Sequence, residues 1–62
     1  MKTIYMIEPK TEEVREWVDE NVGVPDYMWM GPRFAVEARY VDDLIHGMAE
    51  AGFSTPEDFE VL

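Results

Sequence analysis

The chain has 62 residues, which limits it to a single domain, and 47% of them are apolar, which excludes a disordered acidic tail. Fourteen Asp and Glu stand against five Lys and Arg, and the resulting net charge of −9 argues against direct binding to nucleic acid or to an anionic membrane. The chain has no Cys, so neither a disulfide nor a thiolate zinc site supplements its core.

The first predicted element is a buried strand over residues 2–8, because KTIYMIE carries four consecutive apolar residues rich in β-forming types. Up to Glu8 this segment has the pattern of neither a signal peptide nor a membrane span, and we expect a cytoplasmic protein. Pro9 ends the strand, and Thr11 then has the side chain of a helix N-cap.

An amphipathic helix of about three turns is expected after Thr11. Its apolar arc holds Val14, Trp17, Val18 and Val22. The helix ends at Gly23 and Pro25, in the usual order of a C-terminal glycine followed by a proline.

A β-hairpin is predicted next, with YMWM at 27–30 as its first arm and a turn at Gly31-Pro32. In the second arm, FAVEARY at 34–40, alternation places four apolar residues on one face. They are Phe34, Val36, Ala38 and Tyr40.

A second helix is predicted at 42–51. Asp42 and Asp43 would lie in its first turn, where the helix dipole favours negative charge, and Gly52 just beyond its end. Gly47 inside this helix predicts close packing on the sheet, because an exposed glycine there costs about 1 kcal/mol against Ala.

The last segment predicts one turn at 54–58 and a short terminal strand, FEVL, with Phe59 and Val61 inward. The element order is then β-α-β-β-α-β. It predicts one compact acidic domain over residues 1–62, of the α+β class: a small ferredoxin-like sheet with two helices packed on one face.

The first helix carries an unusual charge pattern. At 100° per residue its carboxylates fall within an arc of about 120°. They are Glu12, Glu13, Glu16, Asp19 and Glu20. Like charges at i,i+4 cost about 0.2–0.5 kcal/mol each, so helix stability does not account for this face. Every fourth residue recurs about every 6 Å along the axis, a scale similar to that of phosphates on a nucleic-acid strand. The alternative is an ordinary solvated helix face.

The candidate partner-binding surface extends beyond this helix. We expect it to include Asp26, which follows the helix, and Glu57 and Asp58 near the C-terminus. Tyr27 and Trp29 join it because aromatic residues and Met are frequent at adaptable interfaces. The alternative for YMWM is a core strand.

No motif for catalysis or for metal binding accompanies these residues. The sequence lacks HExxH, a Gly-rich phosphate loop, a Ser/His/Asp set and a calcium loop. His46 falls on the polar side of its helix and has no His or Cys at ligand spacing. We therefore expect neither enzymatic activity nor a metal nor a cofactor.

Size, charge and the lack of catalytic motifs resemble the small acidic inhibitors that phages make against host defence nucleases, including anti-CRISPR and anti-restriction proteins of the DNA-mimic type. The resemblance implies evasion of host defence, with a basic nucleic-acid-binding partner such as a CRISPR effector or a restriction nuclease. Two alternatives stay open. One is an antitoxin-like or regulatory interaction module, and the other is a homodimeric or larger structural or halophile domain that uses YMWM as its contact.

Overall fold

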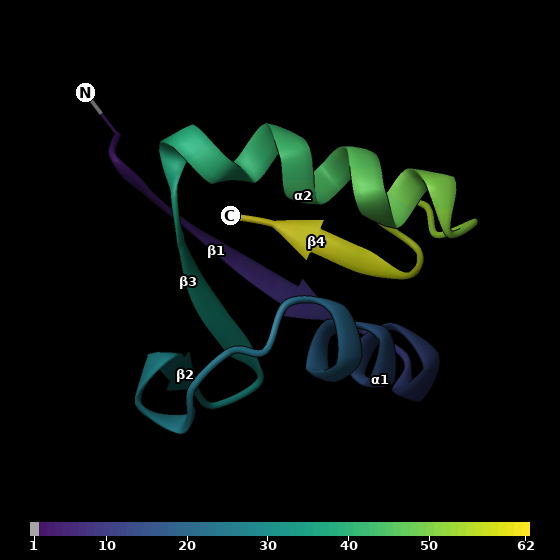
Figure 1. Ribbon diagram of the computed structural model, residues 1–62, viewed down its shortest axis with the longest axis horizontal. Helices are drawn as coiled ribbons and strands as arrows, with labels where there is room; N and C mark the ends of the chain where they lie inside the picture. Colours follow the sequence, from purple (N-terminus) through teal and green to yellow (C-terminus); the bar gives the residue numbers. More distant parts are fainter. Residues whose placement is uncertain (1) are drawn as a thin grey trace.

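The computed structural model describes residues 2–62; Met1, the first residue of the predicted domain, lies outside them. The helices and strands, in chain order, are β1 (Ile4–Pro9), α1 (Glu12–Asn21), the 3-10 turn η1 (Asp26–Met28), β2 (Trp29–Met30), β3 (Arg33–Glu37), α2 (Ala38–Glu50) and β4 (Phe59–Val61). The chain is a small α+β domain with a four-stranded antiparallel sheet and two helices, as expected for the class. In Figure 1, α2 runs along the top of the view and α1 lies at the lower right.

The strand order is β2-β3-β1-β4, so the first strand of the chain lies inside the sheet. β1 pairs antiparallel with β3 on one side and with β4 on the other, and β2 pairs with β3. Residues directly opposite one another in such pairs point to the same face of the sheet. Tyr5 and Ile7 of β1 therefore share a face with Phe34 and Val36 of β3, and Met6 points the other way.

The core lies between that face and the two helices. Its fully or nearly buried members come from both layers, and they are Ile7, Val14, Val18, Phe34, Val41, Met48 and Phe59. Val61 packs against this cluster, so the inward direction predicted for Phe59 and Val61 is confirmed. Every strand residue that belongs to the core or packs against it lies on one face of the sheet.

The signals predicted for α1 are confirmed. The Oγ1 of Thr11 accepts a hydrogen bond from the backbone N–H of Val14 at 3.2 Å. Gly23 has φ +69°, and its N–H donates to the carbonyl of Val18 at 3.1 Å, which closes the helix. Val22, expected on the apolar arc, is the C-cap and remains 39% exposed.

The boundary between β3 and α2 was predicted wrongly. The chain turns helical at Ala38, four residues before the predicted helix start, so Ala38 and Tyr40 are not strand residues. β3 ends there because β1 begins at Ile4, opposite Glu37, so the ladder between the two strands stops at this pair. The N–H of Ala38 then bonds to the carbonyl of Thr3 at 2.8 Å. Asp42 and Asp43 consequently lie in the second turn of α2, and the expectation that they cap its first turn is wrong.

The first arm of the hairpin was also predicted too long. Only Trp29 and Met30 pair with β3. Tyr27 and Met28 belong to η1, in which the N–H of Met28 donates to the carbonyl of Pro25 at 3.0 Å. Tyr27 and Met28 are therefore not strand residues. The turn itself is confirmed, because Gly31 with φ +65° suits a two-residue hairpin connection.

Gly47 does pack closely, but against a helix and not against the sheet. A Cβ placed there would lie 3.4 Å from Cη2 of Trp17. Trp17 in turn meets Phe53 edge to face, with ring centroids 6.3 Å apart. This contact holds α1 and α2 together above the sheet.

Candidate functional site

The acidic outer face of α1 consists of Glu12, Glu13, Glu16, Asp19 and Glu20, and all five residues are exposed. The same helix turns Val14 and Val18 fully into the core and leaves Trp17 half-buried against α2. The apolar arc thus fixes the direction in which the carboxylates point. The arrangement of the two arcs predicted from the sequence is confirmed for these residues.

The position of Arg15 determines how negative this face is. Its guanidinium carbon lies 3.9 Å from the centre of the Trp29 ring, so the cation stacks on β2 and is drawn away from most of the helix surface. Its one carboxylate neighbour is Asp19, with Nε to Oδ1 at 3.9 Å and both side chains more than half exposed.

The other four carboxylates of the face have no such neighbour. Within residues 2–62, no Lys or Arg nitrogen lies within 4.0 Å of the carboxylates of Glu12, Glu13, Glu16 and Glu20. Only solvent and dissolved salt therefore screen the repulsion among these carboxylates. Like charges at i,i+4 spacing, as in Glu12, Glu16 and Glu20, destabilise a helix slightly.

Of the two aromatic residues predicted for the site, only one is free to meet a partner. Tyr27 is 82% exposed in η1, next to Asp26, which is also exposed. Trp29 is half-buried between Arg15 and Phe34. The centroids of the Trp29 and Phe34 rings are 5.0 Å apart. Trp29 therefore joins β2 to α1 and places the hairpin end beside the acidic face.

The two predicted C-terminal acids differ in the same way. Glu57 is exposed at the turn before β4. Asp58 is half-buried, and its Oδ2 accepts a hydrogen bond from the N–H of Ser54 at 2.9 Å. Its carbonyl accepts the N–H of Lys10 at 2.8 Å, which ties the turn to the segment entering α1. Asp58 thus has a structural role in this turn.

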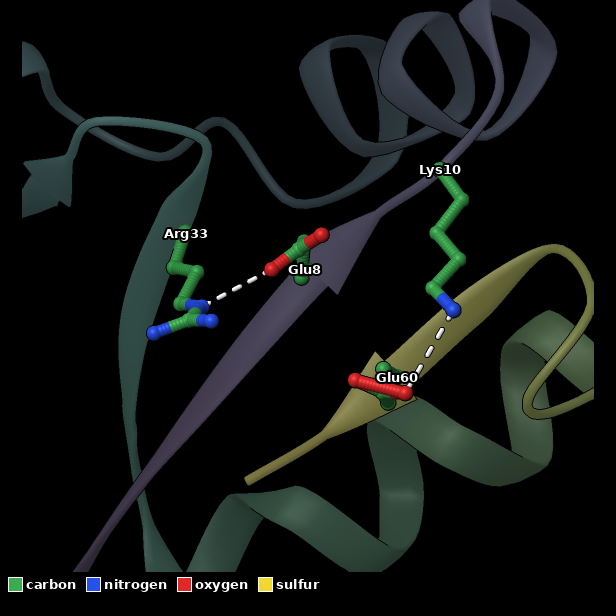
Figure 2. Close-up of polar contacts among 4 residues, drawn as sticks. All are labelled: Glu8, Lys10, Arg33 and Glu60. Atoms are coloured by element: carbon green, nitrogen blue, oxygen red, sulfur yellow. Dashed lines mark hydrogen bonds and ion pairs between the residues drawn. The ribbon is translucent and has the colours of Figure 1, made fainter.

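A second set of acids, absent from the predicted site, lies on the sheet. Glu8 of β1 accepts a hydrogen bond from Nε of Arg33 of β3 at 2.8 Å, and Lys10 pairs with Glu60 of β4 at 3.4 Å (Figure 2). Glu37 pairs with Arg39 at 3.2 Å. Each strand acid therefore has a cation beside it.

Residues 2–62 enclose no pocket, and no three His, Asp or Glu side chains among them gather as a metal site. His46 is exposed, with Nε2 2.8 Å from Oε1 of Glu50 on the same helix. In the described part of the chain, neither helix is long and apolar enough to cross a membrane.

Comparison with protein families, with curated proteins and with solved structures found no match to this chain.

Proposed function

We propose that the chain is a non-enzymatic inhibitor whose acidic α1 face occupies a basic nucleic-acid-binding site on another protein. The observation that carries the proposal is that α1 holds five exposed carboxylates on one side while its single cation stacks on Trp29. A surface of this sign repels nucleic acid and attracts the proteins that bind it. The partner class is a basic nuclease of host defence, such as a CRISPR effector or a restriction enzyme, met in the cytoplasm of the host.

The geometry of the face supports imitation of a phosphate row. Glu12, Glu16 and Glu20 follow one another at i,i+4, about 6 Å apart along the helix axis. The phosphates of one duplex strand recur about every 3.4 Å of axis and lie farther apart along the backbone itself. Because Val14 and Val18 anchor the helix in the core, the row is held rigidly before binding, which lowers the entropy lost on association.

The ferredoxin-like arrangement belongs to the same proposal. It is supported by the β-α-β-β-α-β element order, by a hairpin of β2 and β3, and by antiparallel pairing of β1 with both β3 and β4. The small size of β2 and β4 makes it a minimal version, which presents a helix and not the sheet as its charged surface.

The test is competition for a nucleic-acid site. A purified basic nuclease of the CRISPR or restriction class is bound to a labelled duplex, and this chain is added at about 50 mM and about 500 mM salt. We expect the chain to displace the duplex at low salt. We expect the triple variant Glu12→Gln, Glu16→Gln, Glu20→Gln to lose on the order of 10-fold or more in affinity, because each charge in such an interface contributes about 0.5–1 kcal/mol.

The matched control removes the same amount of charge from α2, with Asp42→Asn, Asp43→Asn and Glu50→Gln. This triple variant is expected to bind within about 3-fold of the unchanged chain, since only non-directional steering is reduced. Equal losses in the two triple variants would show that the acidity acts without a defined face. Tight binding that leaves the duplex in place would contradict nucleic-acid mimicry.

A further inference from the structure

Within residues 2–62, one face of the sheet is covered by neither helix. The core lies on the face that holds Ile7 and Phe34, and the buried residues of both helices belong to that core. We call this opposite surface the open sheet face. Its apolar members are Ile4, Met6, Met30, Ala35 and Leu62.

These apolar side chains are brought together by the strand register. Ala35 lies opposite Met6, and Met6 exchanges two backbone hydrogen bonds with Leu62, at 2.9 and 2.8 Å. The three therefore form one row across β3, β1 and the end of β4. Met6 and Ala35 are half-buried, whereas Leu62 at the end of the row is 38% exposed and Ile4 on the same face is 46% exposed. The open sheet face is therefore partly exposed to solvent in the single chain.

The charges of the open sheet face are matched within the described residues. Glu8, Glu37 and Glu60 have Arg33, Arg39 and Lys10 as their neighbours. These three acids and three cations sum to zero. The remaining acids, together with Lys2 and Arg15, carry the whole net charge of −9, and all of them lie outside the strands. A uniformly repulsive chain thus has one neutral, partly apolar face.

We propose that the open sheet face is a homodimer interface, occupied by the same face of a second copy of this chain. A two-fold axis running along β1 maps β3 onto the position of β4, because both strands flank β1 at the same spacing. Arg33 then comes to lie over Glu60 of the second copy, and Glu60 over its Arg33. The apolar rows of Ala35, Met6 and Leu62 meet between the two sheets.

The charges favour this occupant over the others. A basic partner gains most from the helix side, where the net charge lies, and an anionic lipid surface is repelled by it. Two copies that meet through their neutral faces keep both α1 faces pointing outward and far apart. The contact area of a four-stranded face is of the weak-interface class, so we expect a dissociation constant on the order of 100 µM.

The test measures self-association by sedimentation equilibrium of the full chain between about 10 µM and 1 mM, at about 50 mM and about 500 mM NaCl. We expect a monomer–dimer equilibrium that strengthens several-fold at high salt, because salt screens the repulsion between two acidic chains. Binding to a basic partner has the opposite salt dependence, so the two processes are distinguishable.

A pair of double variants locates the interface. Ile4→Lys with Leu62→Lys buries two cations in the proposed contact and is expected to weaken dimerisation at least 10-fold, although it lowers the net negative charge of the chain. Val22→Lys with Tyr40→Lys is the control, since these residues are 39% and 53% exposed and lie off the sheet. Far-UV circular dichroism checks that both variants fold.

Three results would overturn the proposal. The first is a monomer at about 1 mM protein in about 500 mM NaCl. The second is equal association of the sheet variant and the control. The third is a sheet variant that loses binding to a basic nuclease while the unchanged chain stays monomeric, which would assign the open sheet face to the heterologous partner. The first two results do not depend on whether the α1 face mimics nucleic acid.

Discussion

The outer face of α1 and the open sheet face both carry several carboxylates, yet they differ in what surrounds each charge. On the sheet, Glu8 and Glu60 lie directly opposite one another, and Arg33 and Lys10 from other positions neutralise them (Figure 2). On α1, Glu12, Glu16 and Glu20 have one another as i,i+4 neighbours, and Arg15 points to Trp29. The sheet charges are therefore explained by the fold, and the helix charges are not.

This difference shows that the placement of the few cations defines the surfaces of the molecule. Among the five Lys and Arg, three stand beside strand acids, while Lys2 and Arg15 lie over the rings of Tyr5 and Trp29, at 4.7 and 3.9 Å from their centroids. On the α1 face, only Asp19 has one of these cations beside it, Arg15 at 3.9 Å. A net charge of −9 thus becomes one strongly negative side and one neutral side.

The largest expected effect separates the two faces of the sheet. Phe34 and Met6 lie on opposite faces, the first fully buried under the helices and the second on the open side. We expect Phe34→Ala to lower the free energy of unfolding by about 3–5 kcal/mol, which is close to the whole stability of a domain of this size. Met6→Ala should cost about 1 kcal/mol or less, because its side chain keeps one side in solvent.

Urea unfolding at low protein concentration, where a dimer does not contribute, measures both values. Phe34→Leu serves as the milder core variant if Phe34→Ala does not fold. Similar losses at positions 6 and 34 would mean that both faces are covered in the monomer, which would contradict the open sheet face.

The elements that the sequence predicted well are those with local signals. The start and end of α1 depend on Thr11, Gly23 and Pro25, all within a few residues of the helix. The start of α2 was missed because Ala38 fits both periods, as the fifth residue of an alternating strand and as the residue one turn before Val41. The partner strand decided the outcome, since the pairing of β1 with β3 stops at Ile4 and Glu37.

The candidate site was predictable to the same extent. Helical periodicity alone placed the five carboxylates of α1 on one side, because Val14 and Val18 had to be buried. The stacking of Arg15 on Trp29 and the use of Asp58 in its turn join residues through the tertiary fold and leave no local signal. The sheet pairs are still more remote in sequence: Arg33 and Glu8 are 25 positions apart, and Lys10 and Glu60 are 50 apart.

A smaller effect tests the matched charges of the sheet. Arg33→Gln removes the 2.8 Å contact with Glu8, which is only 23% exposed, and leaves Glu8 facing Glu60. We expect a loss of about 1 kcal/mol in the free energy of unfolding, from the ion pair and from the unrelieved like charges. Arg39→Gln is the control, because its pair with Glu37 is mostly exposed and should contribute less than about 0.5 kcal/mol.

The double variant Arg33→Gln, Glu8→Gln checks the cause of that loss. It should recover most of the stability, since Glu60 then faces a neutral side chain and keeps Lys10. If the double variant is as unstable as the single one, the arginine acts through packing of its stem and not through charge.

The smallest effect has the opposite sign and lies on the helix. Glu20→Gln relieves the i,i+4 repulsion with Glu16 near the C-terminal end of α1, where the dipole also disfavours negative charge, so we expect stabilisation by about 0.5 kcal/mol. Glu12→Gln relieves the same kind of repulsion in the first turn, where the dipole favours a carboxylate, and should leave stability almost unchanged. Thermal unfolding of the two variants at low salt measures the difference, which should vanish at high salt. A destabilising Glu20→Gln would mean that the α1 face is required by the fold, and its exposed charges would then need no partner to account for them.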